Sequence, residues 1–383
     1  MKTDRWSVDW LAFLHVALAR CRAVDIYPQQ IMICEGEGSR RLSFVHGVPG
    51  ENGLASVNFL QDKRKRRALL EAAGVPVPKG ATFTYGAGQD LAADFASRVG
   101  FPLALKPALG DNGVDTVLGI RDEEGLLQAL KTLATPPEQR EHHTQSSYRM
   151  MLLDEPKEVD GEVVVPNRYS FLVERHVRGR LYRFVVSDGK IVSGLRCYGS
   201  PSDGSVRKVR SLPTGAAPAA ADVARRAVEA VPGLFSGAVD VVQPRLVDRR
   251  RSPVVVDLHD RLGLWVNSLE SKRQVLAVAG QVLSDYACAA GAGLRSPQDG
   301  QQDFYVQLQT TDSNALDSFV DRGSGAGLEL DLAIPSRDAG LATGRLSGGL
   351  DEIVDLVGWA FGSATEEPVV SLLRLESLAP KQM

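Results

Sequence analysis

The stretches DKRKRRALLEAAGVPVPKG at residues 62–80 and FPLALKPALGDNGVD at residues 101–115 decide the fold. Lys63 opens an amphipathic run, and Lys106 ends an apolar run that favours a strand. The loop Gly110–Gly113 follows at once. A lysine supplies a compact positive charge, and glycines let backbone N–H groups approach a ligand closely. Strand, lysine and glycine loop together predict a site for a polyphosphate.

The bulk composition indicates a soluble globular protein. The 383 residues are enough for two or three domains, and 44% hydrophobic with 24% charged residues is ordinary usage. The net charge of −3 gives no indication of nucleic-acid binding. No apolar run reaches the length of about 18 residues that a membrane span needs. The four cysteines form no CxxC pair, which favours inert thiols in a reducing compartment. We therefore expect a cytoplasmic protein with no membrane or nucleic-acid partner.

Hydrophobic periodicity predicts alternating helices and strands, an α/β (α+β) protein. Residues 6–21 place a row of apolar side chains on one helical face, and Asp188-Gly189 is a two-residue hairpin turn. Further helices are expected at 62–73, 88–99, 122–133, 219–229 and 271–290, and strands at 30–34, 42–45, 103–106, 116–120, 237–242 and 253–258.

The last part of the chain has its own order of elements. Strand, helix, strand, strand, helix and strand follow one another, which is the ferredoxin-like βαββαβ plan. We expect an N-terminal α/β segment at 1–60, a central domain at 61–290 and a C-terminal module at 303–377. The central domain divides into subdomains at 61–170 and 171–290.

An ordered set of motifs in the central domain resembles a known family. The motifs are DK at 62–63, AGVPVPKG at 73–80, GFPLALKPALGDNGV at 100–114, FLVERHVRG at 171–179, YRFVVSDGKIVSGLR at 182–196, and GAVDVV at 237–242 followed by VVVDLHD at 254–260. No single motif is specific, but the set in this order resembles the ATP-grasp superfamily. Within that superfamily it is most similar to amino-acid and peptide ligases of the cyanophycin-synthetase type. The resemblance implies an ATP-grasp core of two α+β subdomains.

The resemblance also implies the nucleotide contacts. Phosphates would meet Lys63, Lys106 and the loop residues Gly110, Asp111, Asn112 and Gly113, and adenine would meet Glu174, Arg175, His176 and Val177. Two alternatives remain open: Lys63 as a solvated lysine in a charge run, and Glu174 as the partner of Arg175 or Arg178 in a salt bridge. Leu181 stands where the family often places an acidic ribose contact.

A metal site is implied on two neighbouring strands. Asp240 fits the first family carboxylate, and Asp257-Leu258-His259 stands where the family has Glu-x-Asn. Alternation puts Asp257 and His259 on one strand face. Two Mg²⁺ ions are expected, with Mn²⁺ as an alternative. Imidazole is a poorer magnesium ligand than an amide oxygen. Four interpretations of His259 therefore stay open: a metal ligand, a base, a substrate contact or a structural residue.

The resemblance implies an ADP-forming acid–amino-acid ligase. Arg196, Arg183 and Lys106 would be the catalytic residues, since arginine can clamp phosphate oxygens at two points. Both arginines have an alternative as exposed cross-strand ion pairs. ATP, a small carboxylate and an amine would be the partners, and the resemblance admits a homodimer. The alternatives are a degenerate nucleotide-binding regulatory or scaffold subunit and a small-molecule kinase.

Overall fold

The computed structural model describes residues 7–38, 40–110, 116–136, 139, 155–201, 205–244, 252–298, 300–310, 313–336, 340–362 and 369–378. The chain divides into two compact units. Residues 52–260 form one unit, and residues 1–51 with 261–383 form the other. Among the described residues, no helix is long and apolar enough to cross a membrane.

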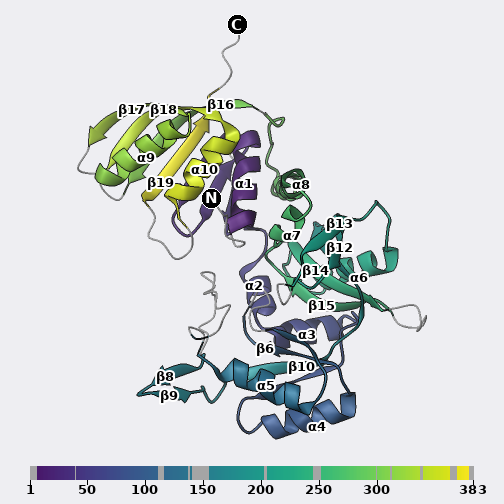
Figure 1. Cartoon of the computed structure of the whole chain (residues 1–383). Coiled ribbons are helices and arrows are strands. Elements are labelled where there is room, and N and C mark those ends of the chain that lie inside the picture. Colours follow the sequence, from purple (N-terminus) through teal and green to yellow (C-terminus); the bar gives the residue numbers. More distant parts are fainter. Residues whose placement is uncertain are drawn as a thin grey trace. The chain divides into compact units, whose positions relative to one another are not determined.

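One half of the unit 52–260 is a four-stranded antiparallel sheet. Its strand order is β5 (Gly80–Thr84), β10 (Ser170–Arg175), β6 (Leu103–Pro107) and β7 (Val117–Ile120). The helices α4 (Gln89–Val99) and α5 (Glu123–Ala134) pack against it (Figure 1). The Asp122 carboxylate accepts a hydrogen bond from the Gly125 amide and caps α5. The helices and strands bury one apolar core that includes Phe171.

The other half of this unit is a five-stranded antiparallel sheet. Its order is β13 (Lys208–Ser211), β12 (Lys190–Tyr198), β11 (Gly179–Ser187), β14 (Ser236–Pro244) and β15 (Val254–His259). The predicted hairpin turn is confirmed, since Asp188 and Gly189 both have positive φ between β11 and β12. The remaining elements are α2 (Leu54–Gln61), α3 (Lys63–Ala72), α6 (Pro218–Glu229) and the hairpin β8 (Lys157–Val159) with β9 (Glu162–Val164).

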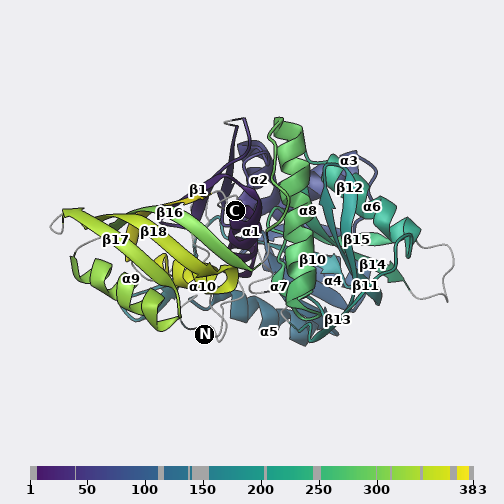
Figure 2. The same cartoon turned by 90° about the horizontal axis from the view of Figure 1, so that it is seen from above.

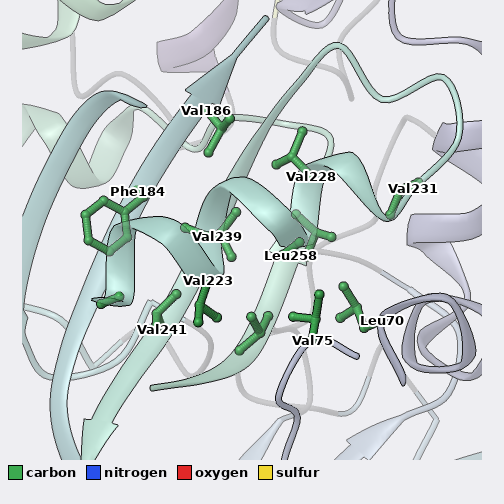
Figure 3. Packing of buried hydrophobic residues seen from close by; sticks show 14 of the residues in the cluster. Leu70, Val75, Phe184, Val186, Val223, Val228, Val231, Val239, Val241 and Leu258 are labelled. Atoms are coloured by element: carbon green, nitrogen blue, oxygen red, sulfur yellow. The ribbon is translucent and has the colours of Figure 1, made fainter. Parts of the chain in front are cut away.

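Helix α6 covers one face of the five-stranded sheet and defines its core. Figure 3 shows Val223 and Val228 of α6 facing the strand residues Val239 and Val241. Leu70 at the end of α3 joins the same cluster. Because α6 fills this face, the opposite face of β11, β14 and β15 is the one that can hold a polar site.

The unit made of both chain ends contains one eight-stranded sheet. Its order is β17 (Glu329–Ser336), β18 (Leu341–Gly349), β16 (Gln301–Thr310), β19 (Val370–Ser377), β1 (Ala23–Tyr27), β2 (Ile31–Glu35), β3 (Arg41–Val45) and β4 (Val48–Pro49). Its helices are α1 (Ser7–Arg20), α7 (Trp265–Ser268), α8 (Lys272–Ala290), α9 (Ser313–Gly325) and α10 (Leu350–Ala360). Helices α9 and α10 lie on the same face of the sheet (Figure 2).

The predicted N-terminal helix is confirmed as α1. Its apolar face is buried, and the Phe13 ring lies 4.9 Å from the Phe44 ring between centroids. Strand β1 was missed by the sequence analysis, because its five residues include Asp25 and show no clean alternation.

The last six elements follow the sequence order strand, helix, strand, strand, helix, strand. The sheet continues beyond them, because β19 pairs with β1 from Ala23↔Glu376 to Ile26↔Leu373. Strands from the two ends of the chain therefore share one sheet. Local sequence patterns carry no signal for a pairing this distant, and the limits at residues 60, 290 and 303 stay predictions.

A charge network crosses β19, β1, β2 and β3 in this sheet. Asp25 is buried, and its two oxygens lie 2.6 Å from Arg374 and 2.8 Å from Arg41. Arg374 also pairs with Glu35 at 3.3 Å. Burial alone would raise the pKa of Glu35, but Arg374, Arg22 and Arg41 outweigh it and lower the pKa below its ordinary value. The network thus stabilises the junction between the two chain ends.

Replacing Arg374 with methionine (Arg374→Met) should lower the free energy of unfolding by about 2 kcal/mol, because buried Asp25 loses a charged hydrogen bond. Urea denaturation followed by circular dichroism measures this. The matched control is Arg345→Met. Its pair with Asp303 is exposed on both sides, so the free energy of unfolding should stay nearly unchanged.

The same comparison has a pH dependence. A carboxyl whose folded pKa is lowered contributes stability above its unfolded pKa and loses it as pH falls through the folded pKa. The difference in the free energy of unfolding between the wild type and Arg374→Met should therefore become smaller as pH falls below 4.5, the ordinary pKa of Glu35. A difference in the free energy of unfolding that stays constant down to a pH at which Glu35 is fully protonated would contradict this account.

Candidate active site

A cavity of about 990 Å³ lies between the two sheets of the unit 52–260. It is lined from one side by β6 and the end of β10, and from the other by β11, β12 and β14. Its volume is at the upper end of the range for ligand pockets. The predicted residues that line it are Lys106, Glu174, Arg175, His176, Val177 and Arg196.

Two backbone amides of the segment after Glu174 bond to neighbouring loops. The Arg175 amide donates to Lys79 O at 2.7 Å, and the His176 amide donates to Pro102 O at 2.9 Å. Within the described residues, the Val177 amide has no such partner. The Val177 amide is therefore a candidate donor to a ligand in the cavity.

Glu174 is held by two cations. Its Oε1 lies 3.0 Å from Arg67 Nη1, and its Oε2 lies 3.0 Å from Lys106 Nζ. Glu174 therefore forms salt bridges, but its partners are Arg67 and Lys106 and not the predicted Arg175 or Arg178. Arg175 instead donates to Val99 O at 2.6 Å.

Lys106 is the buried cation at the cavity wall. It is 3% exposed, and besides Glu174 it donates to Val256 O at 2.8 Å. An ammonium has three N–H donors, so one donor of Lys106 has no partner among the described residues. A buried lysine with this arrangement ties both sheets together and still offers a positive charge to the cavity.

Lys63 lies at the start of α3, where Asp62 caps the helix. The alternative of a solvated lysine is wrong, because Lys63 is 4% exposed and donates to Gly110 O at 2.9 Å. Its contact fixes the beginning of the predicted phosphate loop. Asp111, Asn112 and Gly113 lie outside the described residues.

Two carboxylates face each other across β14 and β15. Asp240 and Asp257 are direct cross-strand partners, and Arg183 of β11 is the partner of Asp240 on its other side. His259 Nε2 lies 3.7 Å from Asp257 Oδ2 and 4.0 Å from Asp240 Oδ2. Alternation places these side chains on the face of the sheet opposite α6. The structure thus brings the three predicted metal residues and Arg183 together.

The environments of the two carboxylates differ. Burial alone would raise the pKa of Asp257, but Arg66, His259, Lys106 and Lys63 lower it well below its ordinary value. Burial raises the pKa of Asp240, and the opposing charges of Arg183 and His259 do not overcome it. Asp257 is thus a stabilised anion, whereas an ionised Asp240 lacks enough compensating charge.

Whether these residues suit a metal ion depends mainly on Asp240. Both of its oxygens are buried and accept no hydrogen bond, and Arg183 Nε stays 3.7 Å away. Buried carboxylate oxygens without donors suit a hard cation such as Mg²⁺. Asp257 is less open, because Arg66 Nη1 lies 2.7 Å from its Oδ1. Among the described residues, no group of three His, Cys, Asp or Glu side chains is arranged to hold a metal. The residues fit a cation through Asp240 first.

Arg66 was missed by the sequence analysis. It lies within the run KRKRR, which reads as a solvated face, yet it is 6% exposed and also donates to Leu258 O at 2.7 Å. The available signal is helical spacing: Lys63, Arg66 and Leu70 are buried at intervals of three and four.

The two predicted catalytic arginines lie on opposite faces of the sheet. Arg183 shares the face of Asp240, whereas Arg196 is the cross-strand partner of Tyr182, which packs in the α6 core. Arg196 still borders the cavity, and its guanidinium lies 4.9 Å from the centre of the Tyr198 ring. Neither forms the exposed cross-strand ion pair of the alternative interpretation among the described residues.

Asp240→Asn and Asp257→Asn should have opposite effects on stability. The first removes an undercompensated charge and should raise the free energy of unfolding by about 1 kcal/mol. The second leaves Arg66 without its partner and should lower it by about 3 kcal/mol.

The expected gain in stability for Asp240→Asn follows from the raised pKa of Asp240. A carboxyl whose folded pKa is raised contributes stability below its ordinary pKa, here 3.8, and loses this contribution as pH rises through the folded pKa. The gain in Asp240→Asn should therefore vanish near pH 3.8. Urea denaturation at several pH values measures the free energy of unfolding of both variants. If this free energy changes in the same direction in both, the two carboxylates are not compensated unequally as described.

Comparison with known proteins agrees with the family resemblance. The chain is 24% identical over 162 residues to the cyanophycin synthetase of Synechocystis sp. strain PCC 6803, and equally to that of Geminocystis herdmanii. These segments cover 42% of this chain but only 15% of either relative. No protein-family model matches.

Solved structures of similar proteins include two ATP-grasp ligases. The D-alanine–D-alanine ligase of Bacillus anthracis has a TM-score of 0.43 and 15% identity, covering 63% of this chain and 71% of that one. The RimK domain ATP-grasp protein of Sphaerobacter thermophilus has a TM-score of 0.41 and 18% identity, covering 60% and 69%. The similarity to cyanophycin synthetases is the one that the motifs predicted.

Proposed function

We propose that the protein is an ATP-dependent carboxylate–amine ligase that forms ADP. The observation that carries the proposal is the cavity between the two sheets. Lys106 and the segment Glu174–Val177 line it, and Lys106 stands close enough to the carboxylates of Asp240 and Asp257 to influence the pKa of both.

The nucleotide would bind along the cavity wall. The Val177 amide would donate to the adenine ring. The third donor of Lys106 would bind a phosphate, and Lys63 would hold Gly110, the first residue of the predicted phosphate loop. Because the cavity wall is cationic, it favours the polyphosphate electrostatically.

Asp240 and Asp257 would hold Mg²⁺, with His259 beside them. Bound there, Mg²⁺ supplies neutralisation of the phosphate charge. Asp240 lies 3.7 Å from Arg183 Nε, and the Arg183 guanidinium would stabilise negative charge on the transferred phosphoryl group. Arg196 would act at the cavity margin.

The proposed reaction has two balanced steps. A substrate carboxylate oxygen attacks the γ-phosphorus and ADP leaves, which gives an acyl phosphate. An amine nitrogen then attacks the acyl carbon, phosphate leaves, and the amine loses a proton. The protein's part is mainly positioning and charge stabilisation. The acyl substrate is an amino acid or short peptide by resemblance.

ADP and phosphate release, measured with pairs of standard amino acids, tests the proposal. Lys106→Met should lower the rate by at least about a hundredfold, because a phosphate ligand and the tie between the sheets are lost. The matched control Lys131→Met, on the exposed face of α5, should leave the rate unchanged. Hydroxylamine should trap the acyl phosphate, which a small-molecule kinase would not form. Full activity of Lys106→Met would refute the assignment.

A second candidate is a nucleotide-binding subunit without catalysis. The ion pair of Asp257 with Arg66 and the leucine at position 181 favour it, because both weaken the family's metal and ribose contacts. Calorimetric titration of ATP separates the two candidates: a binding subunit would bind ATP equally with and without Mg²⁺ and release no ADP.

A further inference from the structure

A stripe of cationic side chains lies at one corner of the five-stranded sheet. Arg196 pairs in register with Arg210, and Tyr198 pairs with Lys208, across β12 and β13. Arg180 on β11 belongs to the same face by alternation. Arg180, Arg196, Tyr198, Lys208 and Arg210 together form the basic stripe.

Among the described residues, the positive charges of the basic stripe have no compensating carboxylate. No ion pair or hydrogen bond joins the side chains of Arg180, Arg196, Lys208 or Arg210 to another described residue, and only Arg196 has a side-chain partner, the Tyr198 ring. Tyr198 itself is 41% exposed. Like charges opposite each other in a sheet are destabilising, so the stripe has a cost that a bound anion would remove.

Protection of a sheet edge accounts for only part of the stripe. Lysine on an edge strand discourages edge-to-edge association, and β13 is the edge strand of its sheet. That explanation covers Lys208 and Arg210. It does not cover Arg180 and Arg196, which stand on the inner strands β11 and β12.

We propose that the basic stripe binds an extended acidic peptide segment, which is the acceptor in the proposed ligation. On an extended chain alternate residues point to the same side, so carboxylates at every second position would meet Lys208 and Arg210. The backbone of the peptide would add to the edge of β13. Arg180, Arg196 and Tyr198 also line the cavity, so the stripe borders the proposed nucleotide pocket.

Nucleic acid fits these observations less well. The chain carries a net charge of −3, and the stripe offers one exposed aromatic ring for stacking. An edge strand with cations alternating along it matches a polypeptide. This identification of the acceptor rests on the proposed function, whereas the binding of the peptide does not.

Fluorescence anisotropy with a labelled peptide of alternating glutamate and threonine, without ATP, tests the binding. The double variant Lys208→Gln, Arg210→Gln should bind about tenfold more weakly, because two ion pairs are lost. The matched control Arg121→Gln, Lys131→Gln removes the same charge from β7–α5 and should bind as the wild type does. Thermal melting checks that both variants are folded.

Three further probes test the mode of binding. A peptide with lysine for glutamate should not bind, and N-methylation of the peptide backbone should abolish strand addition. An oligonucleotide of equal charge should compete less well than the unlabelled peptide. Equal affinity of the Lys208→Gln, Arg210→Gln variant, stronger competition by the oligonucleotide, or no binding of the acidic peptide would each overturn the proposal.

The two proposals fail separately. Peptide binding without ADP release under any condition would reject the ligase and leave the stripe intact. ADP release with free amino acids, unchanged in the double variant, together with absent peptide binding, would reject the stripe and leave the ligase intact.

Discussion

The buried pair Asp240 and Asp257 is the constraint on which the unit 52–260 depends. Two carboxylates as cross-strand neighbours away from water need cations around them. Arg66 comes from α3, Lys106 from β6 and Arg183 from β11. The same charges that let the acids be buried therefore hold helix α3 and the four-stranded sheet against the five-stranded sheet.

The negative charges of the two carboxylates are compensated unequally, and this difference links the stability of the unit to the proposed function. Asp257 has Arg66 at 2.7 Å, while both oxygens of Asp240 lack a hydrogen bond. A buried group left unsatisfied costs stability, and such costs are tolerated where a ligand relieves them. Asp240 is accordingly the carboxylate of this pair whose charge is left undercompensated.

Much of the fold could be predicted from the sequence. Helical and strand periodicity located α1, α3, α4, α5, α6 and α8 to within a residue or two, and the Asp188-Gly189 turn fixed the β11–β12 hairpin. Lys106 and the segment Glu174–Val177 were placed at one cavity by the order of motifs. The partners of Glu174, the burial of Arg66 and the separation of Arg183 from Arg196 were not predicted, because each depends on elements distant in sequence.

What the sequence determined by itself was local: which residues form each element, which side chains share a strand face, and which motifs resemble ATP-grasp ligases. Periodicity and turn chemistry act over a few residues, so a single segment carries them. The tertiary structure decided the rest. Pairing of β19 with β1, the direction from which Arg66 reaches Asp257, and the row of cations on β11, β12 and β13 arise only when distant strands align. Burial then sets the energy of each charge, since the low dielectric of the interior depends on the whole fold.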